Sequence, residues 1–368
     1  DIHIEPRDEG LQVRYRVDGI LSLKELYRDS AEFLQGITSR IKIISGMDIT
    51  ERRRPQDGRI DNYVFNGKSY DIRVSAIGTL LGEKVVLRIL DKYAEASDLV
   101  SLGFTLADEE RIKKMLSSRN GIIYLGGATG TGKTTTLYSM IEIIKSDEIN
   151  IYTIEDPVER VIDNINHIQV NPIAGITFAS TLRSLLRQDP DVIVVGEIRD
   201  RETTELSIRA SLTGHLVLTT VHANSATDVI GRIYDMGIEP YLISASALGF
   251  ISQVLVRVLC PNCKELAEPD PNQRMWLEQV YQKYGVQGGE YYRPVGCSQC
   301  NNIGYRGRTA VAEIITVDDE LKEMIVEKRG AKAIREKIIG QGFVPLELGV
   351  FEKIRKGVTS ISEAMRVL

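Results

Sequence analysis

Apolar and polar positions alternate in short runs over residues 1–95, which is the pattern of half-buried β-strands. Turn dipeptides such as Asp18-Gly19 and Asn66-Gly67 separate the runs, which are IHIEP, LQVRYRV, YVFNG and SYDIRVSAI. Only the segment 31–46 has helical spacing instead. The pattern therefore predicts a small α+β domain over residues 1–95.

From residue 104 to 259 the pattern changes to fully apolar strands that alternate with helix-compatible stretches. The strand-like runs are GIIYLGG, IYTIED, VIVVGE and LVLTTVH. This alternation predicts a mainly parallel α/β sheet. The polar stretch DKYAEASDL, 91–99, is a linker candidate, and we place the linker between the two domains at 96–103. Gln253 and Arg257 interrupt the apolar stretch 242–259, which argues against a membrane span. We therefore expect this stretch to form a buried helix.

Residues 127–134 read GATGTGKT, a full match to the phosphate-binding loop G-x-x-x-x-G-K-[ST]. An apolar strand precedes the loop and a helix-compatible stretch follows it, as such an anion site requires. Lys133 is expected to bridge the β- and γ-phosphates of a nucleotide, and the Thr134 hydroxyl to hold Mg²⁺. The predicted nucleotide contacts in this segment are Gly127, Ala128, Thr129, Gly130, Thr131, Gly132, Lys133, Thr134 and Thr135.

Polar residues follow three of the predicted strands. Because ligand chemistry in a parallel sheet collects at the carboxyl ends of its strands, these residues are catalytic candidates. Glu197 follows four apolar residues and is the best candidate to orient or deprotonate the attacking water. Gly196 stands where a metal-supporting Asp is usual, so Glu155 or Asp156 would take over part of the Mg²⁺ shell through water. His222 would sense the γ-phosphate; a structural role for this histidine remains open.

Arginines supply the positive charge that phosphoryl transfer needs. Arg183 and Arg187 are four residues apart on a predicted helix, either as a solvated face or as phosphate ligands. Three more arginines lie on strand-like segments with apolar neighbours, where an arginine needs an anionic partner: these are Arg59, Arg73 and Arg88. They are expected to act as arginine fingers toward the ATP of a neighbouring subunit.

The four cysteines fall in two C-x-x-C pairs, 260–263 and 297–300. Such pairs indicate a tetrahedral Zn²⁺ site in a reducing compartment, although the gap between them is longer than that of a usual zinc ribbon. Two redox pairs are the alternative. The predicted zinc ligands are Cys260, Cys263, Cys297 and Cys300.

Composition narrows the class of protein. The 368 residues allow two or three domains, and a formal net charge of -5 argues against a nucleic-acid-binding surface. No apolar run approaches the ~20 residues of a membrane span. No signal peptide is evident, which favours a cytoplasmic location, and a chain that starts at Asp1 inside a strand reads as a trimmed one.

Taken in order, the motifs are similar to those of the bacterial secretion ATPase superfamily. They are DIHIEP, RRRPQDGRI, DIRVS followed by GEKVVLRIL, GATGTGKTTTLY, YTIEDPVE, RQDPDVIVVGEIRD and TGHLVLTTVHAN. The branch that the chain resembles is that of type II secretion and type IV pilus assembly ATPases. The cysteine pairs support that branch, because retraction-type pilus ATPases generally lack them.

The resemblance implies a hexameric ring in which ATP lies between a PAS-like domain, 1–95, and a RecA-like core, 104–259. A zinc subdomain, 260–303, and a helical C-terminal part, 304–368, would follow. The Walker A loop is then 127–134, the Asp box lies around Glu155 to Glu159, and an atypical Walker B motif carries Glu197. The His box contains His215 and His222. In this family, several arginines are proposed to contact phosphates. The residues that match them here are Arg73, Arg88, Arg183, Arg187 and Arg199.

One substitution and one omission stand out against the family. Ala128 replaces a common proline of the loop, and we expect the family's further N-terminal domain, which docks on membrane partners, to be absent from this sequence. The implied partners are other copies of the chain, an inner-membrane platform protein and a cytoplasmic adaptor. The chain would thus act at the inner face of the membrane without entering it. A RecA-like nucleic-acid translocase and a scaffold without turnover remain as alternatives.

Overall fold

The computed structural model describes residues 1–28, 31–90, 98–339 and 342–368. The chain divides into two compact units, Asp1–Glu95 with Glu159–Val161 and Ala96–Val158 with Ile162–Leu368. Of the polar linker candidate 91–99, residues 91–97 lie outside the described ones, and the linker placed at 96–103 is described from residue 98 onward. Its residues Leu99–Leu102 form the short helix α2.

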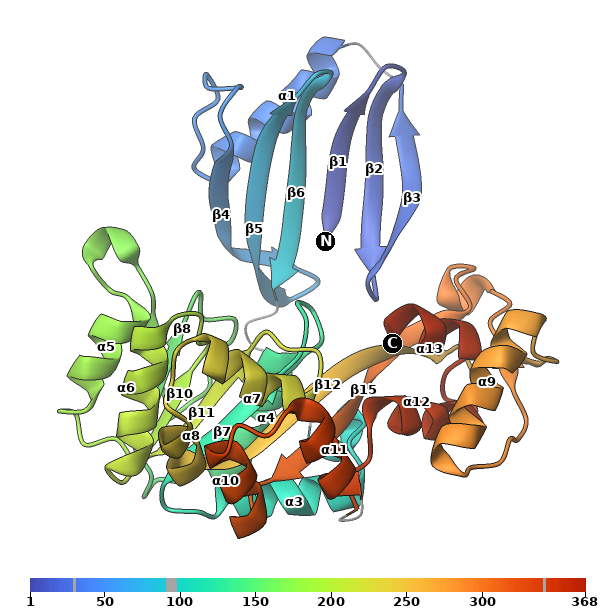
Figure 1. The fold of residues 1–368 in the computed structure, drawn as a ribbon. Coiled ribbons are helices and arrows are strands. Elements are labelled where there is room, and N and C mark those ends of the chain that lie inside the picture. Colours follow the sequence, from blue (N-terminus) through green and yellow to red (C-terminus); the bar gives the residue numbers. More distant parts are fainter. Residues whose placement is uncertain (29–30, 91–97, 340–341) are drawn as a thin grey trace. The chain divides into compact units, whose positions relative to one another are not determined.

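The first unit is a six-stranded antiparallel sheet with the strand order β3-β2-β1-β6-β5-β4. Helix α1 lies against one face of this sheet (Figure 1). The elements are β1 (Ile2–Arg7), β2 (Gly10–Val17), β3 (Ile20–Tyr27), α1 (Ala31–Ile44), β4 (Gln56–Phe65), β5 (Lys68–Thr79) and β6 (Gly82–Leu90). The sequence predicted this mixture of strands and one helix.

Alternation along the strands separates the two faces of this sheet. Apolar positions such as Val74 and Val85 point toward α1 and pack with Ile41 into a small core. Many positions between them are charged or polar and lie on the other face, among them Arg73, Ser75 and Arg88. The buried Lys42–Glu83 pair, in contrast, involves α1 itself.

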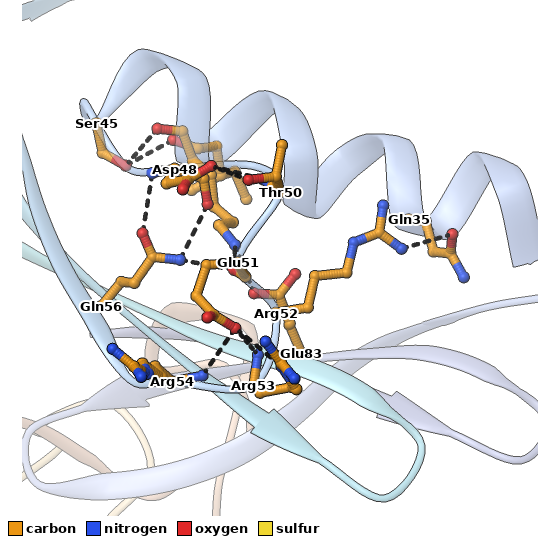
Figure 2. Close-up of polar contacts among 12 residues, drawn as sticks. Gln35, Ser45, Asp48, Thr50, Glu51, Arg52, Arg53, Arg54, Gln56 and Glu83 are labelled. Carbon is orange, nitrogen blue, oxygen red and sulfur yellow. Dashed lines mark hydrogen bonds and ion pairs between the residues drawn. The ribbon is translucent and has the colours of Figure 1, made fainter.

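Hydrogen bonds fix the turn between α1 and β4 (Figure 2). The Gln56 side chain donates to the carbonyls of Asp48 and Glu51 at 3.0 and 2.8 Å and accepts from the Asp48 N–H at 2.9 Å. Lys42, whose side chain is 1% exposed, donates to the Glu51 carbonyl and to the Glu83 carboxylate at 2.6 and 2.7 Å. The turn is thereby tied to both α1 and the β5–β6 hairpin.

The second unit is built on a seven-stranded sheet with the order β15-β12-β7-β11-β10-β8-β9. Neighbouring strands are parallel except for the β12–β15 pair. The first elements are α3 (Leu106–Leu116), β7 (Gly121–Gly126), α4 (Lys133–Ile144), β8 (Ile151–Glu155), β9 (Asn166–Gln169), α5 (Phe178–Leu185), β10 (Val192–Val195), α6 (Arg201–Leu212), β11 (Leu216–Val221), α7 (Ala226–Asp235), α8 (Pro240–Ser246) and β12 (Ala247–Leu259). This confirms the predicted mainly parallel α/β sheet, with β9 inserted where a helix was expected directly after β8.

Helices cover both faces of the parallel strands. Residues of α3 and α4 pack on one face around Ile123 and Leu125, and residues of α5 to α8 pack on the other around Tyr124 and Phe250. The rings of Tyr124 and Phe250 stack at 5.4 Å. Because both faces are buried, the carboxyl ends of the strands are the part of the sheet left for polar chemistry.

The predicted helix at 242–259 is wrong. Only its first residues belong to α8, and the rest form β12, which pairs with β7 and β15. A central strand buried on both faces carries a continuous apolar run, which periodicity cannot distinguish from a buried helix. Gln253, expected to interrupt a helix, instead points to the phosphate-binding loop.

The rest of the second unit contains short strands and helices. They are β13 (Glu265–Leu266), α9 (Pro271–Tyr284), β14 (Tyr292–Arg293), β15 (Tyr305–Thr316), α10 (Asp319–Val326), α11 (Ala331–Ile339), α12 (Leu346–Arg355) and α13 (Ile361–Val367). The segment predicted as a helical C-terminal part thus begins with a strand of the main sheet. No helix among the described residues is long and apolar enough to cross a bilayer.

Candidate nucleotide-binding site

The glycine-rich loop joins β7 to α4 in the way the sequence predicted. Gly127, Gly130 and Gly132 all have positive φ, at 150°, 79° and 85°. A Cβ at Gly127 would lie 2.4 Å from Thr131 Oγ1. These glycines allow the loop to fold tightly on itself and to turn its backbone N–H groups toward a ligand.

Helix α4 begins at Lys133, directly after the loop. Its N-cap residue is Gly132, which offers no side-chain cap, so the first backbone N–H groups are left for an anion. Lys133 Nζ donates to the carbonyls of Gly127 and Ala128 at 2.7 and 2.9 Å. Burial lowers the pKa of Lys133, and the nearby charge of Glu197 opposes that effect. Loop, lysine and Glu197 therefore lie in one electrostatic environment.

The side chain of Gln253, in β12, holds the phosphate-binding loop through a hydrogen bond. Its side chain is 1% exposed, and its Nε2 donates to the Thr131 carbonyl at 2.7 Å. A Cβ at Gly132 would lie 3.3 Å from the same nitrogen. The sequence analysis missed this residue because it assigned 242–259 to a helix.

Glu197 lies just after β10 and is flanked by two basic side chains. Its Oε1 is 2.5 Å from the Arg199 guanidinium, and its Oε2 is 3.5 Å from His222 Nε2. The carboxylate is 15% exposed, whereas Arg199 and His222 are more open. The structure thus brings together three of the residues that the sequence predicted for this site.

Glu155, at the end of β8, is a buried carboxylate held by protein donors. Tyr138 donates to its Oε2 at 2.5 Å, and Thr153 donates to its Oε1 at 2.7 Å. A Cβ at Gly196 would lie 3.5 Å from Glu155 Cγ, an ordinary van der Waals distance, and 3.0 Å from the Ile154 carbonyl oxygen. Gly196, which stands where the usual Asp was expected, therefore lies beside Glu155 of the neighbouring strand.

The arginines of the α5 region lie differently from the prediction. Arg183 is in the last turn of α5 and pairs with Glu202 of α6. Arg187 follows the C-cap Leu186, so it lies beyond the helix, and its guanidinium donates to the Arg183 carbonyl at 2.9 Å. The two side chains do not form the expected pair on one helical face.

Arg59, Arg73 and Arg88 belong to the first unit, where they form a row. Arg59 is opposite Arg73 in the β4–β5 register, and Arg73 is opposite Arg88 in the β5–β6 register. Arg59 pairs with Asp71 at 2.5 Å, and Arg88 pairs with Asp1 at 3.0 Å. For Arg59 and Arg88 the anionic partner predicted for such arginines is thus present within the unit.

An open hollow of about 600 Å³ lies beside the loop. Ala128 and Thr129 line one side of it, and His222 and residues of α7 line the other. The hollow gives the loop access to solvent and leaves space for a ligand.

The four cysteines form a second candidate site. Their sulfur atoms all lie within 4.8 Å of one another, and the Cys260–Cys297, Cys263–Cys300 and Cys297–Cys300 pairs are 3.9, 3.8 and 3.8 Å apart. Zinc–sulfur bonds of ~2.3 Å at tetrahedral angles place sulfurs about 3.8 Å apart, whereas a disulfide needs ~2.05 Å. The spacing fits a metal and excludes disulfides in this arrangement.

Backbone donors favour the thiolate form of one of these cysteines. Burial alone would raise the pKa of Cys300, but N–H groups of Cys297 and Gly304 donate to its sulfur at 3.2 Å each and lower the pKa to about 6. A metal ligand must be deprotonated, so these donors suit zinc coordination.

Sequence reasoning missed the residues that hold Glu155. Tyr138 is one helical turn after Thr134, so its position toward the site could have been inferred from the helix period. Thr153 is two residues before Glu155 on β8, so strand alternation could have placed it on the same face. His167 carries no such signal, because it meets Thr153 only through the parallel pairing of β8 and β9.

A parallel sheet with a phosphate-binding loop after one strand and a carboxylate after another defines a P-loop nucleotide-binding protein. The motifs and the rest of the chain narrow this class further. Residues 1–366 match the family model described as "Type II/IV secretion system protein". The chain belongs to this family.

Relatives with curated names agree with that assignment. The chain is 46% identical over 367 residues to "Type II secretion system ATPase E" of Vibrio cholerae, covering all of this chain and 71% of that protein. It is 41% identical over 371 residues to "Type IV pilus assembly ATPase TfpB" of Acinetobacter baylyi, covering all of this chain and 62% of that protein. Both relatives are therefore longer than this sequence.

Solved structures show the same fold. The ATPase DotB of Legionella pneumophila is similar with a TM-score of 0.74 at 22% identity, over 99% of this chain and 90% of that one. The pilus retraction motor PilT, solved with bound ADP, is similar with a TM-score of 0.63 at 23% identity, over 99% and 92%.

Proposed function

We propose that this chain hydrolyses ATP and uses the energy to drive the assembly of pilin or pseudopilin subunits, in type IV pilus extension or in type II secretion. The observation that carries the proposal is the phosphate-binding loop between β7 and α4, with the Glu197 carboxylate just after β10 of the same parallel sheet. Family membership and the names of relatives such as the Vibrio cholerae ATPase support the same activity.

The residues of the site divide the work of hydrolysis. The loop N–H groups and Lys133 would hold the phosphates, and Glu197 would orient the attacking water and accept its proton. Thr134, with Glu155 acting through water, would hold Mg²⁺, which neutralises charge on the phosphates when bound. Arg199 and His222 touch Glu197, and so they are placed to respond to the transferred phosphoryl group.

We infer that the working form is a hexameric ring on the cytoplasmic side of the inner membrane, with a platform protein and an adaptor as partners. The first unit, an antiparallel sheet with one helix on its face, supports the PAS-like assignment. Its row of Arg59, Arg73 and Arg88 places three guanidinium groups on neighbouring strands, of which Arg59 and Arg88 pair with Asp71 and Asp1. Guanidinium groups suit the phosphates of ATP, which would take the place of these carboxylates. Sedimentation with ATP tests the ring, and a monomer at every concentration contradicts it.

Zinc is the metal we propose for the cysteine cluster. The sulfur spacing and the backbone donors to Cys300 both fit a Cys₄ zinc site. Such a site is closed to substrate and stabilises local structure, so its role here is structural.

Phosphate release by the purified chain tests the proposed activity. The wild type should hydrolyse ATP, and Lys133→Ala should abolish turnover and weaken ATP binding, because the ammonium neutralises phosphate charge in both ground and transition states. Single- and double-stranded DNA should leave the rate unchanged. Stimulation by DNA favours the nucleic-acid translocase, and ATP binding without any phosphate release favours a scaffold.

A further inference from the structure

Glu155 is held by a chain of hydrogen bonds that reaches away from the phosphate-binding loop. Thr153 Oγ1 donates to Glu155 Oε1 at 2.7 Å, and His167 Nδ1 lies 2.8 Å from the same Thr153 oxygen. The other nitrogen of His167, Nε2, is 3.1 Å from the backbone N–H of Ile162. This series of hydrogen bonds thus runs from the Ile162 backbone, through His167 of β9 and Thr153 of β8, to the buried Glu155 carboxylate.

Only one assignment of donors and acceptors satisfies all the hydrogen bonds in this series. Because a backbone N–H can only donate, His167 Nε2 accepts from Ile162, and the neutral ring carries its proton on Nδ1. Nδ1–H then donates to Thr153 Oγ1, whose own proton goes to Glu155. Nδ1 is also 3.2 Å from Glu155 Oε1, so the imidazole faces the carboxylate directly as well.

Burial raises the free-energy cost of losing one of these hydrogen bonds. The side chains of His167 and Glu155 are 7% and 6% exposed, so water does not replace a lost hydrogen bond readily. Tyr138, from the helix that follows the loop, holds the second carboxylate oxygen at 2.5 Å. One oxygen of Glu155 is therefore fixed from α4, and the other from β8 and β9.

We propose that His167 is a positioning residue for ATP hydrolysis, which sets the orientation of the Glu155 carboxylate through Thr153. The proposal rests on the proposed function, in which Glu155 supports the metal shell. In that role the direction of the carboxylate oxygens matters, and a displacement of about 1 Å can lower a rate on the order of 10²-fold. The same histidine ties Glu155 to the backbone at Ile162, where the chain returns from the Asp156–Val161 segment.

Two amide substitutions separate the contact of the His167 ring with Thr153 from its contact with the Ile162 backbone. Asparagine places an amide nitrogen near the position of Nδ1 and does not reach Ile162, whereas glutamine extends its amide to the position of Nε2 and leaves no donor near Thr153. We expect His167→Gln and His167→Phe to lower kcat by tenfold or more, with KM for ATP within twofold of wild type. His167→Asn should keep kcat within threefold, while amide exchange at Ile162 becomes faster.

Ile168→Ala is the matched control for a purely structural effect. Ile168 is the next residue of β9 and packs against the core on the other side of the sheet. This variant should lower the melting temperature as much as His167→Phe or more, and it should leave kcat within twofold. A merely structural histidine would behave in the same way as this control.

A double-mutant cycle with Glu155→Gln completes the test. If His167 acts through Glu155, then His167→Phe has little further effect in the Glu155→Gln background. Equal effects in both backgrounds, or His167→Phe with kcat within twofold of wild type, overturn the proposal. Full turnover by Glu155→Gln removes the role of Glu155 itself while ATP hydrolysis stands, and absence of turnover in the wild type removes the proposed function.

Discussion

Each of the two units contains a buried carboxylate that several side chains hold in place. Glu5 in the first unit and Glu155 in the second are each almost inaccessible to water, but their surroundings differ. Glu5 is surrounded by cationic side chains, whereas Glu155 is held by the neutral groups of Tyr138, Thr153 and His167. Charge pairing serves stability in the first case. In the second, neutral donors orient the carboxylate and leave its negative charge available.

Glu5 should make the stability of the first unit depend on pH. Burial alone would raise its pKa, but hydrogen bonds and charges from Arg14 and Lys84 outweigh burial and lower the pKa to about 2. Because the folded pKa is below the ordinary value near ~4.3, the contribution is complete above about pH 4.5 and is lost as pH falls toward 2. Glu5→Gln should therefore destabilise the unit by about 1–3 kcal/mol at pH 7 and by less at pH 3.

Hydrogen exchange of β1 and β2 in the full chain measures this effect. Glu9→Gln is the control, because the Glu9–Arg28 pair is exposed on both sides and should contribute little. Equal protection in Glu5→Gln and wild type at pH 7 would show that the buried carboxylate is not a stabilising group.

Single positions show which candidate residues the sequence alone can indicate. The loop glycines, Lys133 and Glu197 could be proposed because each is defined by its place in a local motif. Gly196 was recognised as a departure, but its position beside Glu155 follows only from the parallel pairing of β8 and β10. His167 could not be predicted, since its partners come from another strand and from a loop.

At the scale of elements, apolar strands between helices were predicted correctly and the segment 242–259 was not. The strands β7, β10 and β11 are short and end in motifs, so their type was clear. Strand β12 is long, buried on both faces and directly preceded by the helix α8, and nothing in its apolar pattern marks the change. Pairing with two other strands decided its structure.

The cysteine cluster gives a prediction for the elements around it. We expect one Zn²⁺ per chain, and removal of the metal should loosen residues 260–300 before the strands of the parallel sheet open, because a Cys₄ site contributes folding energy locally. Hydrogen exchange with and without a chelator checks the order of these events. Elemental analysis that finds no zinc in protein purified without chelator contradicts the assignment.

At the scale of the whole molecule, the sequence indicated two kinds of sheet and the order in which they occur. It could not show which distant segments join the same sheet, because such pairing depends on contacts far apart in the sequence. The strand β15 illustrates the limit: it joins the main sheet although it follows the cysteine pairs by several residues. Long-range antiparallel pairing of this kind leaves no local signal.

The central claim is that the molecule turns over ATP with Glu197 acting on the water. The most direct test is phosphate release and ATP binding measured in parallel on wild type and Glu197→Gln, with Glu205→Gln of α6 as the control for loss of a carboxylate elsewhere. We predict that Glu197→Gln binds ATP within threefold of wild type and loses turnover by about 10² or more, because general-base catalysis contributes that much. Turnover within threefold of wild type would contradict the account.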